Sequence, residues 1–358
     1  MRRITTAGTL VITLLLACFV NIGAAADKST EPKLSCNNYF GCRIENGVTD
    51  DLIKEVLQKG KLSEKPLTLR NVSNADLGKL VGLGPDLVHL AVERSDQLTD
   101  IKPLGQLTGL RTLVLDTLKS LTDLGPIAKL THLTSLQVKR VEYKSLDYLK
   151  PLNQLEELVF FMQPKEPSDI SVLAGKTKLT KLRFYGAHIT DLTPLKSSTE
   201  LQELSLYMTE VADLSTLRNM KKLTKLDLYS VPAKDLSPVG DLANLKSIWL
   251  YSTHFLDYSV LSKCTKLEEL HAGISDFDKL EVIEKMPNLK SLKLWREKIK
   301  DWDALKTASN LEILELKEVG FSDVRMLTDM SNLKWLILDK RKATNRKAVE
   351  AWMGETVG

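Results

Sequence analysis

Histidine and cysteine are scarce in this chain, and neither is arranged for catalysis or metal binding. The 358 residues include five histidines, which are scattered without a recurrent Ser or Cys partner, and four cysteines. The sequence also has no glycine-rich phosphate loop, no zinc-binding spacing of Cys and His, and no nucleophile elbow. These absences argue against the common classes of enzyme, and we expect no catalytic residues, no cofactor and no metal site.

A strong excess of either charge is also missing. The chain has 50 Lys and Arg residues against 46 Asp and Glu residues, which gives a formal net charge of +4. Proteins that bind nucleic acid usually concentrate basic residues on one face or along one stripe. The charge balance therefore gives no support for a nucleic-acid partner.

Leucine, by contrast, recurs at regular intervals through most of the chain. From Leu179 onward the frame Leu-x-x-Leu-x-Leu, or a close variant, starts every 22 residues, and the earlier steps are 22 to 24 residues. The frames open at Leu87, Leu110, Leu133, Leu155, Leu179, Leu201, Leu223, Leu245, Leu267, Leu289, Leu311 and Leu333. A period of this length predicts a leucine-rich-repeat solenoid, in which each repeat buries its apolar side only against its neighbours.

A single repeat explains the form of the frame. In residues 201–207 the strand period of two turns Leu204 and Leu206 toward the core and Ser205 and Tyr207 toward the outside. The chain then turns and places further apolar residues in the core before the next frame begins. We therefore predict an α/β fold in which parallel strands form a concave sheet and short helical or irregular segments form the convex side.

Between the frames, residues 100–104, 191–195 and 235–239 share the pattern Asp-Ile/Leu-x-Pro-Leu/Val. They resemble the convex segment of the 22-residue, internalin-like class of bacterial leucine-rich repeats, and the resemblance implies a right-handed solenoid. That class usually carries Asn three residues after the strand, where it ties adjacent turns together. Here the position holds Ala187, Thr209, Val231, Thr253, Ser275, Glu297 and Val319. We therefore expect the turns to be held together by core packing, and we do not transfer the host-cell binding of the class to this chain.

Residues 1–26 have the features of a signal peptide. Arg2 and Arg3 precede an uncharged apolar stretch that ends in three alanines at Ala26. We predict cleavage there and export to the periplasm, the cell surface or the medium. The sequence Leu-Leu-Ala-Cys ending at Cys18 resembles a bacterial lipobox, which gives an alternative in which Cys18 is the lipidated first residue and attaches the protein to a membrane.

Residues 27–63 are predicted to cap the N-terminal end of the solenoid, which we place at residues 64–339. Cys36 and Cys42 bracket a short loop, and in an exported protein such a pair is expected to form a disulfide.

A helix is predicted in the same cap, with Thr49 as its N-cap and Gly60 as its stop. Its expected buried stripe consists of Leu52, Ile53, Val56 and Leu57. Residues 340–358 are predicted to form a second helical cap at the other end of the solenoid.

Aromatic residues occupy one outward position in successive central repeats. The residue directly after the frame is Phe161, Tyr185, Tyr207, Tyr229 and Tyr251 in turn, and Trp249 and Trp295 lie close to this row. Exposed aromatic side chains bordered by charges are typical of a partner-binding surface. The alternative is that the rings only stabilise the sheet, as cross-strand aromatic pairs do.

Taken together, the sequence favours a non-enzymatic, exported interaction protein. We expect a monomer whose concave aromatic face binds another protein, with a glycan as the alternative ligand because Tyr and Trp also stack on sugars. The competing interpretation is a structural or regulatory envelope lipoprotein anchored through Cys18.

Overall fold

The computed structural model describes residues 31–37, 41–59, 62–161, 169–321, 327 and 330–338. The predicted signal peptide with Cys18, and the predicted cap at residues 340–358, lie outside the described residues. The chain forms two compact units, one of residues 31–242 and one whose described part begins at Ala243. Each unit is described by itself.

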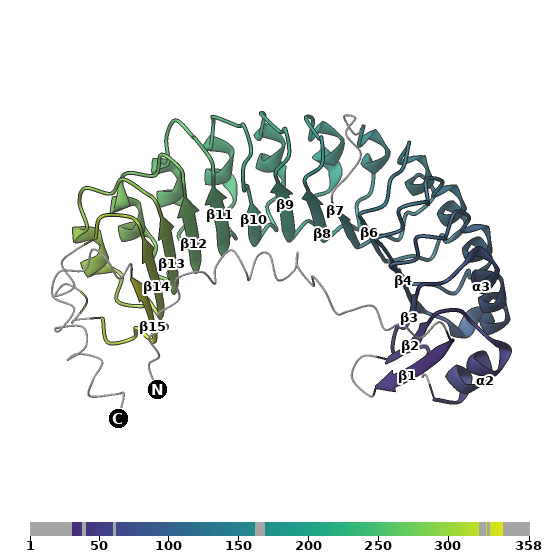
Figure 1. The fold of residues 1–358 in the computed structure, drawn as a ribbon. Coiled ribbons are helices and arrows are strands. Elements are labelled where there is room, and N and C mark those ends of the chain that lie inside the picture. The colour runs from purple at the N-terminus through teal and green to yellow at the C-terminus, as the bar shows by residue number, and fades with distance from the viewer. Residues whose placement is uncertain are drawn as a thin grey trace, which may run out of the picture. The chain divides into compact units, whose positions relative to one another are not determined.

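In the unit of residues 31–242, the strands follow one another across the sheet in chain order (Figure 1). They are β1 (Lys33–Asn37), β2 (Gly41–Glu45), β3 (Leu67–Arg70), β4 (His89–Glu93), β5 (Thr112–Asp116), β6 (Ser135–Lys139), β7 (Glu157–Phe161), β8 (Lys181–Tyr185), β9 (Glu203–Tyr207) and β10 (Lys225–Asp227). The hairpin of β1 and β2 is antiparallel, and every later neighbouring pair in this unit is parallel.

The unit that begins at Ala243 continues the same architecture. Its strands are β11 (Ser247–Tyr251), β12 (Glu269–Gly273), β13 (Ser291–Trp295), β14 (Ile313–Lys317) and β15 (Trp335–Leu338). They pair in parallel, in chain order. The leucine-rich-repeat fold and its parallel sheet are therefore confirmed.

The core consists of the inward residues of the frames. Leu204 and Leu206 are buried, and Leu204 lies opposite Leu182 on one side and Leu226 on the other. Because the register aligns equivalent residues of successive repeats, each repeat places its leucines against those of its neighbours, as the strand period of two predicted.

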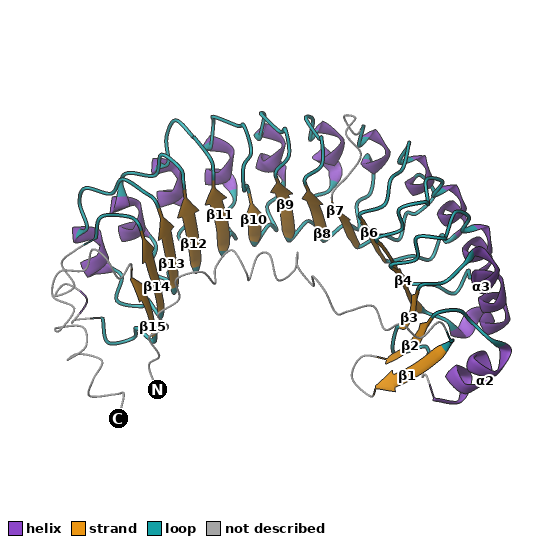
Figure 2. Ribbon diagram, viewed as in Figure 1, coloured by secondary structure: helices purple, strands orange, loops and turns teal. Residues whose placement is uncertain are grey.

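On the other side of each repeat the chain forms short 3-10 helices, drawn in purple in Figure 2. Up to residue 242 they are η1 (Leu80–Asp86), η2 (Lys102–Gln106), η3 (Gly125–Lys129), η4 (Asp147–Leu149), η5 (Ser171–Leu173), η6 (Thr193–Ser197), η7 (Ser215–Asn219) and η8 (Ser237–Asp241). In the second unit they are η9 (Ser259–Lys263), η10 (Leu280–Lys285) and η11 (Asp303–Thr307).

The Asp of the Asp-Ile/Leu-x-Pro pattern closes the turn at the start of η2, η6 and η8. Asp191 accepts a hydrogen bond from the backbone N–H of Thr193 at 2.8 Å and one from its hydroxyl at 2.6 Å. Asp235 accepts the same pair of bonds from Ser237. The carboxylate therefore satisfies a backbone donor at the start of the 3-10 helix.

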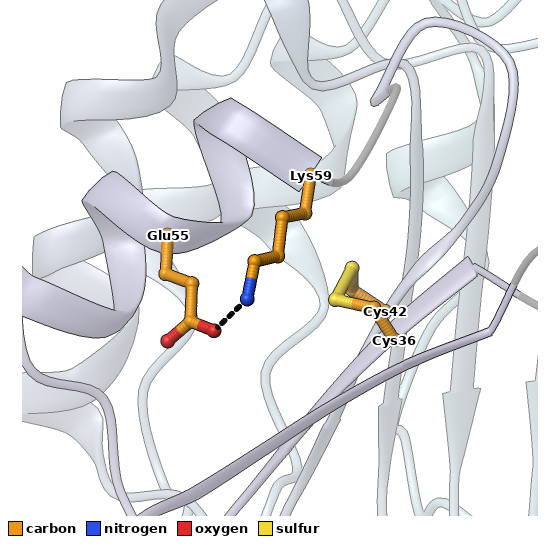
Figure 3. The surroundings of a disulfide bond; sticks show 4 residues. All are labelled: Cys36, Cys42, Glu55 and Lys59. Carbon is orange, nitrogen blue, oxygen red and sulfur yellow. Dashed lines mark hydrogen bonds and ion pairs between the residues drawn. A yellow bond between two sulfur atoms is a disulfide. The ribbon is translucent and has the colours of Figure 1, made fainter.

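The N-terminal cap contains more strand than the sequence predicted. The sequence analysis predicted a disulfide-bonded loop and a helix in residues 27–63 and no strand there, whereas β1 and β2 extend the sheet, and Cys42 of β2 lies opposite Leu67 of β3. In the hairpin only Cys42 and Ile44 have buried apolar side chains. The sequence of the hairpin therefore lacks the alternation of apolar and polar residues by which a strand is predicted. Within the hairpin, Cys36 and Cys42 are joined by a disulfide with their Cα atoms 4.1 Å apart (Figure 3).

The predicted cap helix is present as α2 (Asp50–Lys59), and a short second helix, α3 (Asn74–Lys79), follows. Thr49 is the N-cap, since its hydroxyl oxygen accepts the N–H of Leu52 at 3.2 Å. The predicted stripe is partly wrong, because Val56 is buried but Leu57 is 48% exposed. Leu57 follows Val56 directly, so its side chain is rotated by about 100° around the helix axis, away from the buried face. An ion pair between Glu55 and Lys59 spans one turn of α2 beside the disulfide (Figure 3).

The missing Asn ladder has only partial substitutes. Thr209 and Thr253 occupy ladder positions, but each hydroxyl donates to a carbonyl of its own repeat. Glu297 does connect two repeats, because its carboxylate accepts the N–H and the hydroxyl of Ser275 at 2.9 and 2.8 Å.

A row of alternating charges also links repeats of the second unit. Lys246 contacts Glu268 at 2.9 Å, Glu268 contacts Lys290 at 3.0 Å, and Glu312 contacts Lys334 at 2.6 Å. These residues each lie one position before a strand, so the period of 22 places them side by side.

Candidate functional site

Phe161, Tyr185, Tyr207 and Tyr229 lie in a row across the sheet of the first unit. The parallel register places Phe161 opposite Tyr185, and Tyr185 opposite Tyr207. Their ring centroids are 5.6 Å apart for Phe161 and Tyr185, and 5.7 Å apart for Tyr185 and Tyr207. Tyr207 and Tyr229 are closer, at 4.3 Å, and are stacked with an interplanar angle of 20°.

Phe161 differs from the other members of the row. It is only 8% exposed, and the guanidinium of Arg140 lies 5.6 Å from its ring centroid. The expectation that the whole row is open to a partner is therefore wrong at Phe161, because a neighbouring arginine and Tyr185 cover its ring. Tyr185, Tyr207 and Tyr229 are half-buried, and we call these three the tyrosine ladder.

The central residue of the ladder, Tyr207, is uncharged at physiological pH. Burial, followed by the neighbouring Tyr229 and Asp227, raises the pKa of Tyr207 to about 12, so its phenol keeps its proton. Asp227 accepts the hydroxyl of Ser205 at 2.9 Å and the N–H of Tyr229 at 3.0 Å. Ser205 was expected to be an outward surface residue, but it is 5% exposed because its hydroxyl is directed to this carboxylate and the neighbouring strand covers it.

Charged residues lie on the same strands as the ladder, β8 and β9, and on β10, and they are paired with one another. Glu203 contacts Arg183 at 2.6 Å, Lys225 at 3.7 Å and Lys181 at 3.9 Å. Burial opposes the ionisation of Glu203, but the hydrogen bond from Arg183 and the three cations lower its pKa overall. Lys181 also lies 3.9 Å from Glu157.

A second aromatic cluster lies in the unit that begins at Ala243. The ring of Trp249 stacks on that of His271 with centroids 5.4 Å apart. Burial, with a smaller contribution from Lys293, lowers the pKa of His271 to about 3, so the imidazole is neutral. On strand β13, the ring of Trp295 lies 5.7 Å from the guanidinium of Arg296.

Tyr251 of this cluster uses a glycine that the sequence analysis did not recognise as part of the site. A Cβ atom on Gly273 would lie 2.4 Å from Cδ1 of Tyr251, which shows that the Tyr251 ring lies directly over Gly273. The same Cβ would lie 3.2 Å from Cβ of Trp295. The interruption of the aromatic row by glycine in β12 was the available signal, because it leaves room for the ring of the neighbouring strand.

We expect Gly273→Ala to destabilise the protein by about 1–3 kcal/mol, because the added methyl group overlaps the Tyr251 ring. Denaturant unfolding measures the change. Gly78→Ala is the control, since nothing lies within 4 Å of its Cβ position and it lies in α3. Equal unfolding midpoints for wild type and Gly273→Ala would contradict the described position of Tyr251.

The described residues contain no group of three or more His, Cys, Asp or Glu side chains placed to hold a metal ion. Across the same part of the chain, no helix has the length and apolar character needed to cross a membrane.

No family model matches the sequence, and neither does any curated protein. Its structure is similar to an internalin, InlF, of Listeria monocytogenes, at 23% identity and a TM-score of 0.69, over 85% of this chain and 92% of the other. It is also similar to a leucine-rich-repeat protein of Leptospira interrogans, at 19% identity and a TM-score of 0.70, over 82% and 75%. The plant peptide hormone receptor RGFR1, solved in complex with RGF2, is similar over 86% and 55%, at 14% identity and a TM-score of 0.52. The chain thus has the fold of internalin-like leucine-rich-repeat proteins.

Proposed function

We propose that this protein is a non-enzymatic, exported interaction module that binds a partner protein through the tyrosine ladder. The observation that carries the proposal is a continuous row of half-buried tyrosine rings on a sheet whose core is already complete without them. Tyrosine is enriched among the residues that dominate binding energy at protein interfaces, since it gives a large contact area with little loss of side-chain entropy.

The paired charges beside the ladder support the same proposal. An interface commonly has an apolar or aromatic centre with a polar rim. Here Glu203 and its cationic neighbours Lys181, Arg183 and Lys225 supply such a rim. Trp249, Tyr251 and Trp295 are proposed to form a further binding surface on the second unit.

The competing explanation is that the rings serve only stability. Aromatic pairs contribute about 0.5–1.5 kcal/mol beyond their buried area, and the ladder has two such contacts. The two explanations differ in which measured quantity changes when the rings are removed.

For the double variant Tyr207→Ser/Tyr229→Ser we expect partner binding to weaken by about 2 kcal/mol or more per important ring, because hot-spot rings carry energy of this size. A pull-down with the exported chain identifies proteins that the wild type captures, and calorimetry with the captured partner gives the affinity. The control variant Lys196→Ser/Asn219→Ser changes two exposed residues of η6 and η7 and should bind as wild type does. An unchanged affinity together with a clear fall in unfolding midpoint would refute the proposal and favour a purely stabilising role.

Export is part of the proposal and has its own test. Intact-mass analysis of the protein from its native compartment should give a chain that starts near Asp27 and is two hydrogens lighter than the reduced form, because Cys36 and Cys42 are bonded. A diacylglycerol-modified Cys18 at the N-terminus would instead establish the lipoprotein alternative.

A further inference from the structure

The repeat distance of the tyrosine ladder restricts the shape of the ligand that can follow it. Neighbouring strands stand about 4.8 Å apart, and the ring centroids are 5.7 Å apart for Tyr185 and Tyr207 and 4.3 Å apart for Tyr207 and Tyr229. A chain that lies along the ladder must therefore present equivalent groups at about 4.8 Å, or at a multiple of that distance.

The width of the ladder adds a second restriction. On one side lie Arg183 and Glu203, which form a close ion pair. Directly after Tyr207 in the chain is Met208, which is 53% exposed, so the strip is one aromatic ring wide with a single apolar side chain added at Tyr207. An amphipathic helix buries an apolar stripe at least about 100° wide, which this strip does not match.

The charge of the site gives a third restriction. Each cation beside the ladder already contacts Glu203, and the phenol of Tyr207 stays protonated. A cationic ligand would be repelled by these three cations, and an anionic ligand would have to compete with Glu203 for them. The matching ligand is therefore neutral, narrow and extended.

A polyproline II helix meets these three conditions. It rises about 3.1 Å per residue with three residues per turn, so residues i and i+3 lie on the same side about 9.3 Å apart, close to twice the strand spacing. In an extended β-strand, side chains on the same side recur every two residues, about 6.6 Å apart. This spacing matches neither the strand separation of about 4.8 Å nor twice that distance. Aromatic-lined surfaces are also suited to proline rings, because the polyproline II conformation is already formed before binding.

We propose that the tyrosine ladder binds a proline-rich segment of its partner in the polyproline II conformation, with residues i and i+3 against Tyr185 and Tyr229 and the chain between them crossing Tyr207. This inference rests on the proposed function, because it names the chemistry of the partner at the same site. In this proposal the binding energy comes from proline rings that pack against the tyrosine rings, and not from ion pairs.

The test uses fluorescence polarisation with the full exported chain and labelled decaproline. We expect decaproline to bind at least tenfold more tightly than a Gly-Ser peptide of the same length. Tyr207→Ser/Tyr229→Ser should reduce the affinity for decaproline at least tenfold, whereas Lys196→Ser/Asn219→Ser should leave it unchanged. Raising the salt concentration from 0.1 to 0.5 M should change the affinity less than twofold, because no new ion pair forms. Circular dichroism of each variant checks that it is folded.

Two results would overturn the inference: equal affinity for decaproline and the Gly-Ser peptide, or binding of decaproline that survives the double tyrosine substitution. Competition with the partner from the pull-down separates this failure from failure of the proposed function. A partner lost in the tyrosine variant but not displaced by decaproline would refute the polyproline inference alone. A partner retained by the folded tyrosine variant would refute the proposed function. Displacement of that partner by a neutral oligosaccharide, and not by decaproline, would make the ladder a sugar site.

Discussion

Leu226→Ala is expected to lower the free energy of unfolding by about 2–5 kcal/mol, because it removes a buried side chain and leaves a cavity in the core of the first unit. Leu226 lies opposite Leu204 in the register of β9 and β10, so the loss affects two adjoining repeats. Denaturant unfolding followed by circular dichroism measures the difference.

Gln202→Ala provides the matched control, since Gln202 is exposed and its side chain faces solvent beside the same strands. Its expected cost is under about 0.5 kcal/mol. Ser205→Ala, which the sequence alone ranks with such surface changes, is now expected to cost about 1–3 kcal/mol because it removes the hydroxyl donor from Oδ2 of Asp227 and leaves only the N–H of Tyr229 on Oδ1. Comparable midpoints for Leu226→Ala and Gln202→Ala would refute the register.

The second large effect concerns Glu297, which is only 2% exposed and has a carboxylate oxygen, Oε2, with no hydrogen-bond partner among the described residues. Burial raises its pKa to about 7, the bonds from Ser275 oppose the rise, and the nearby charge of Asp276 adds to it. Nδ1 of His254 lies 2.9 Å from the carboxylate of Asp276.

The sign of the resulting pH dependence follows from the direction of this shift. Between the usual pKa of 4.5 and about 7 the folded protein holds a proton that the unfolded chain has released. The contribution of Glu297 to stability is therefore fully present below pH 4.5 and is lost as the pH rises through 7, by about 3 kcal/mol in total.

His271 acts in the opposite direction, so the two groups must be separated. Its pKa is lowered from 6.5 to about 3, and its contribution to stability is present above pH 6.5 and lost as the pH falls. The pH profile of the wild type alone therefore contains two opposing slopes between pH 4.5 and 6.5.

The difference between Glu297→Gln and wild type isolates the glutamate. We expect the variant to gain stability relative to wild type as the pH rises from 4.5 to 8, approaching about 3 kcal/mol, because the amide cannot ionise. Glu281→Gln, at an exposed position of η10, is the matched control for the substitution itself. A constant difference for Glu297→Gln would show that its carboxyl titrates normally.

The repeat frame was sufficient to predict the fold, because an inward leucine at a fixed spacing is a property of the sequence itself. Leu204 and Leu206 are buried for that reason. The hairpin of β1 and β2 could not be predicted in the same way, because it depends on pairing with β3 rather than on its own apolar pattern.

The candidate site was predictable in its position but not in its exposure. The spacing placed Phe161 and the three tyrosines in one row, as the register bears out up to Tyr207. The burial of Phe161 depends on Arg140, which belongs to the preceding repeat and gives no local signal. The role of Gly273 likewise depends on the side chain of another strand.

The row of alternating charges in the second unit has a consequence for the number of repeats. Each Lys of the row contacts a Glu one repeat away, as Lys246 and Lys290 both contact Glu268. Removing the single repeat that carries Glu268 would bring Lys246 and Lys290 side by side, and like charges on adjacent strands are destabilising. Removing two consecutive repeats would restore opposite neighbours. In this part of the chain, changes of length in steps of two repeats preserve the pairing of charges, whereas a change of one repeat does not.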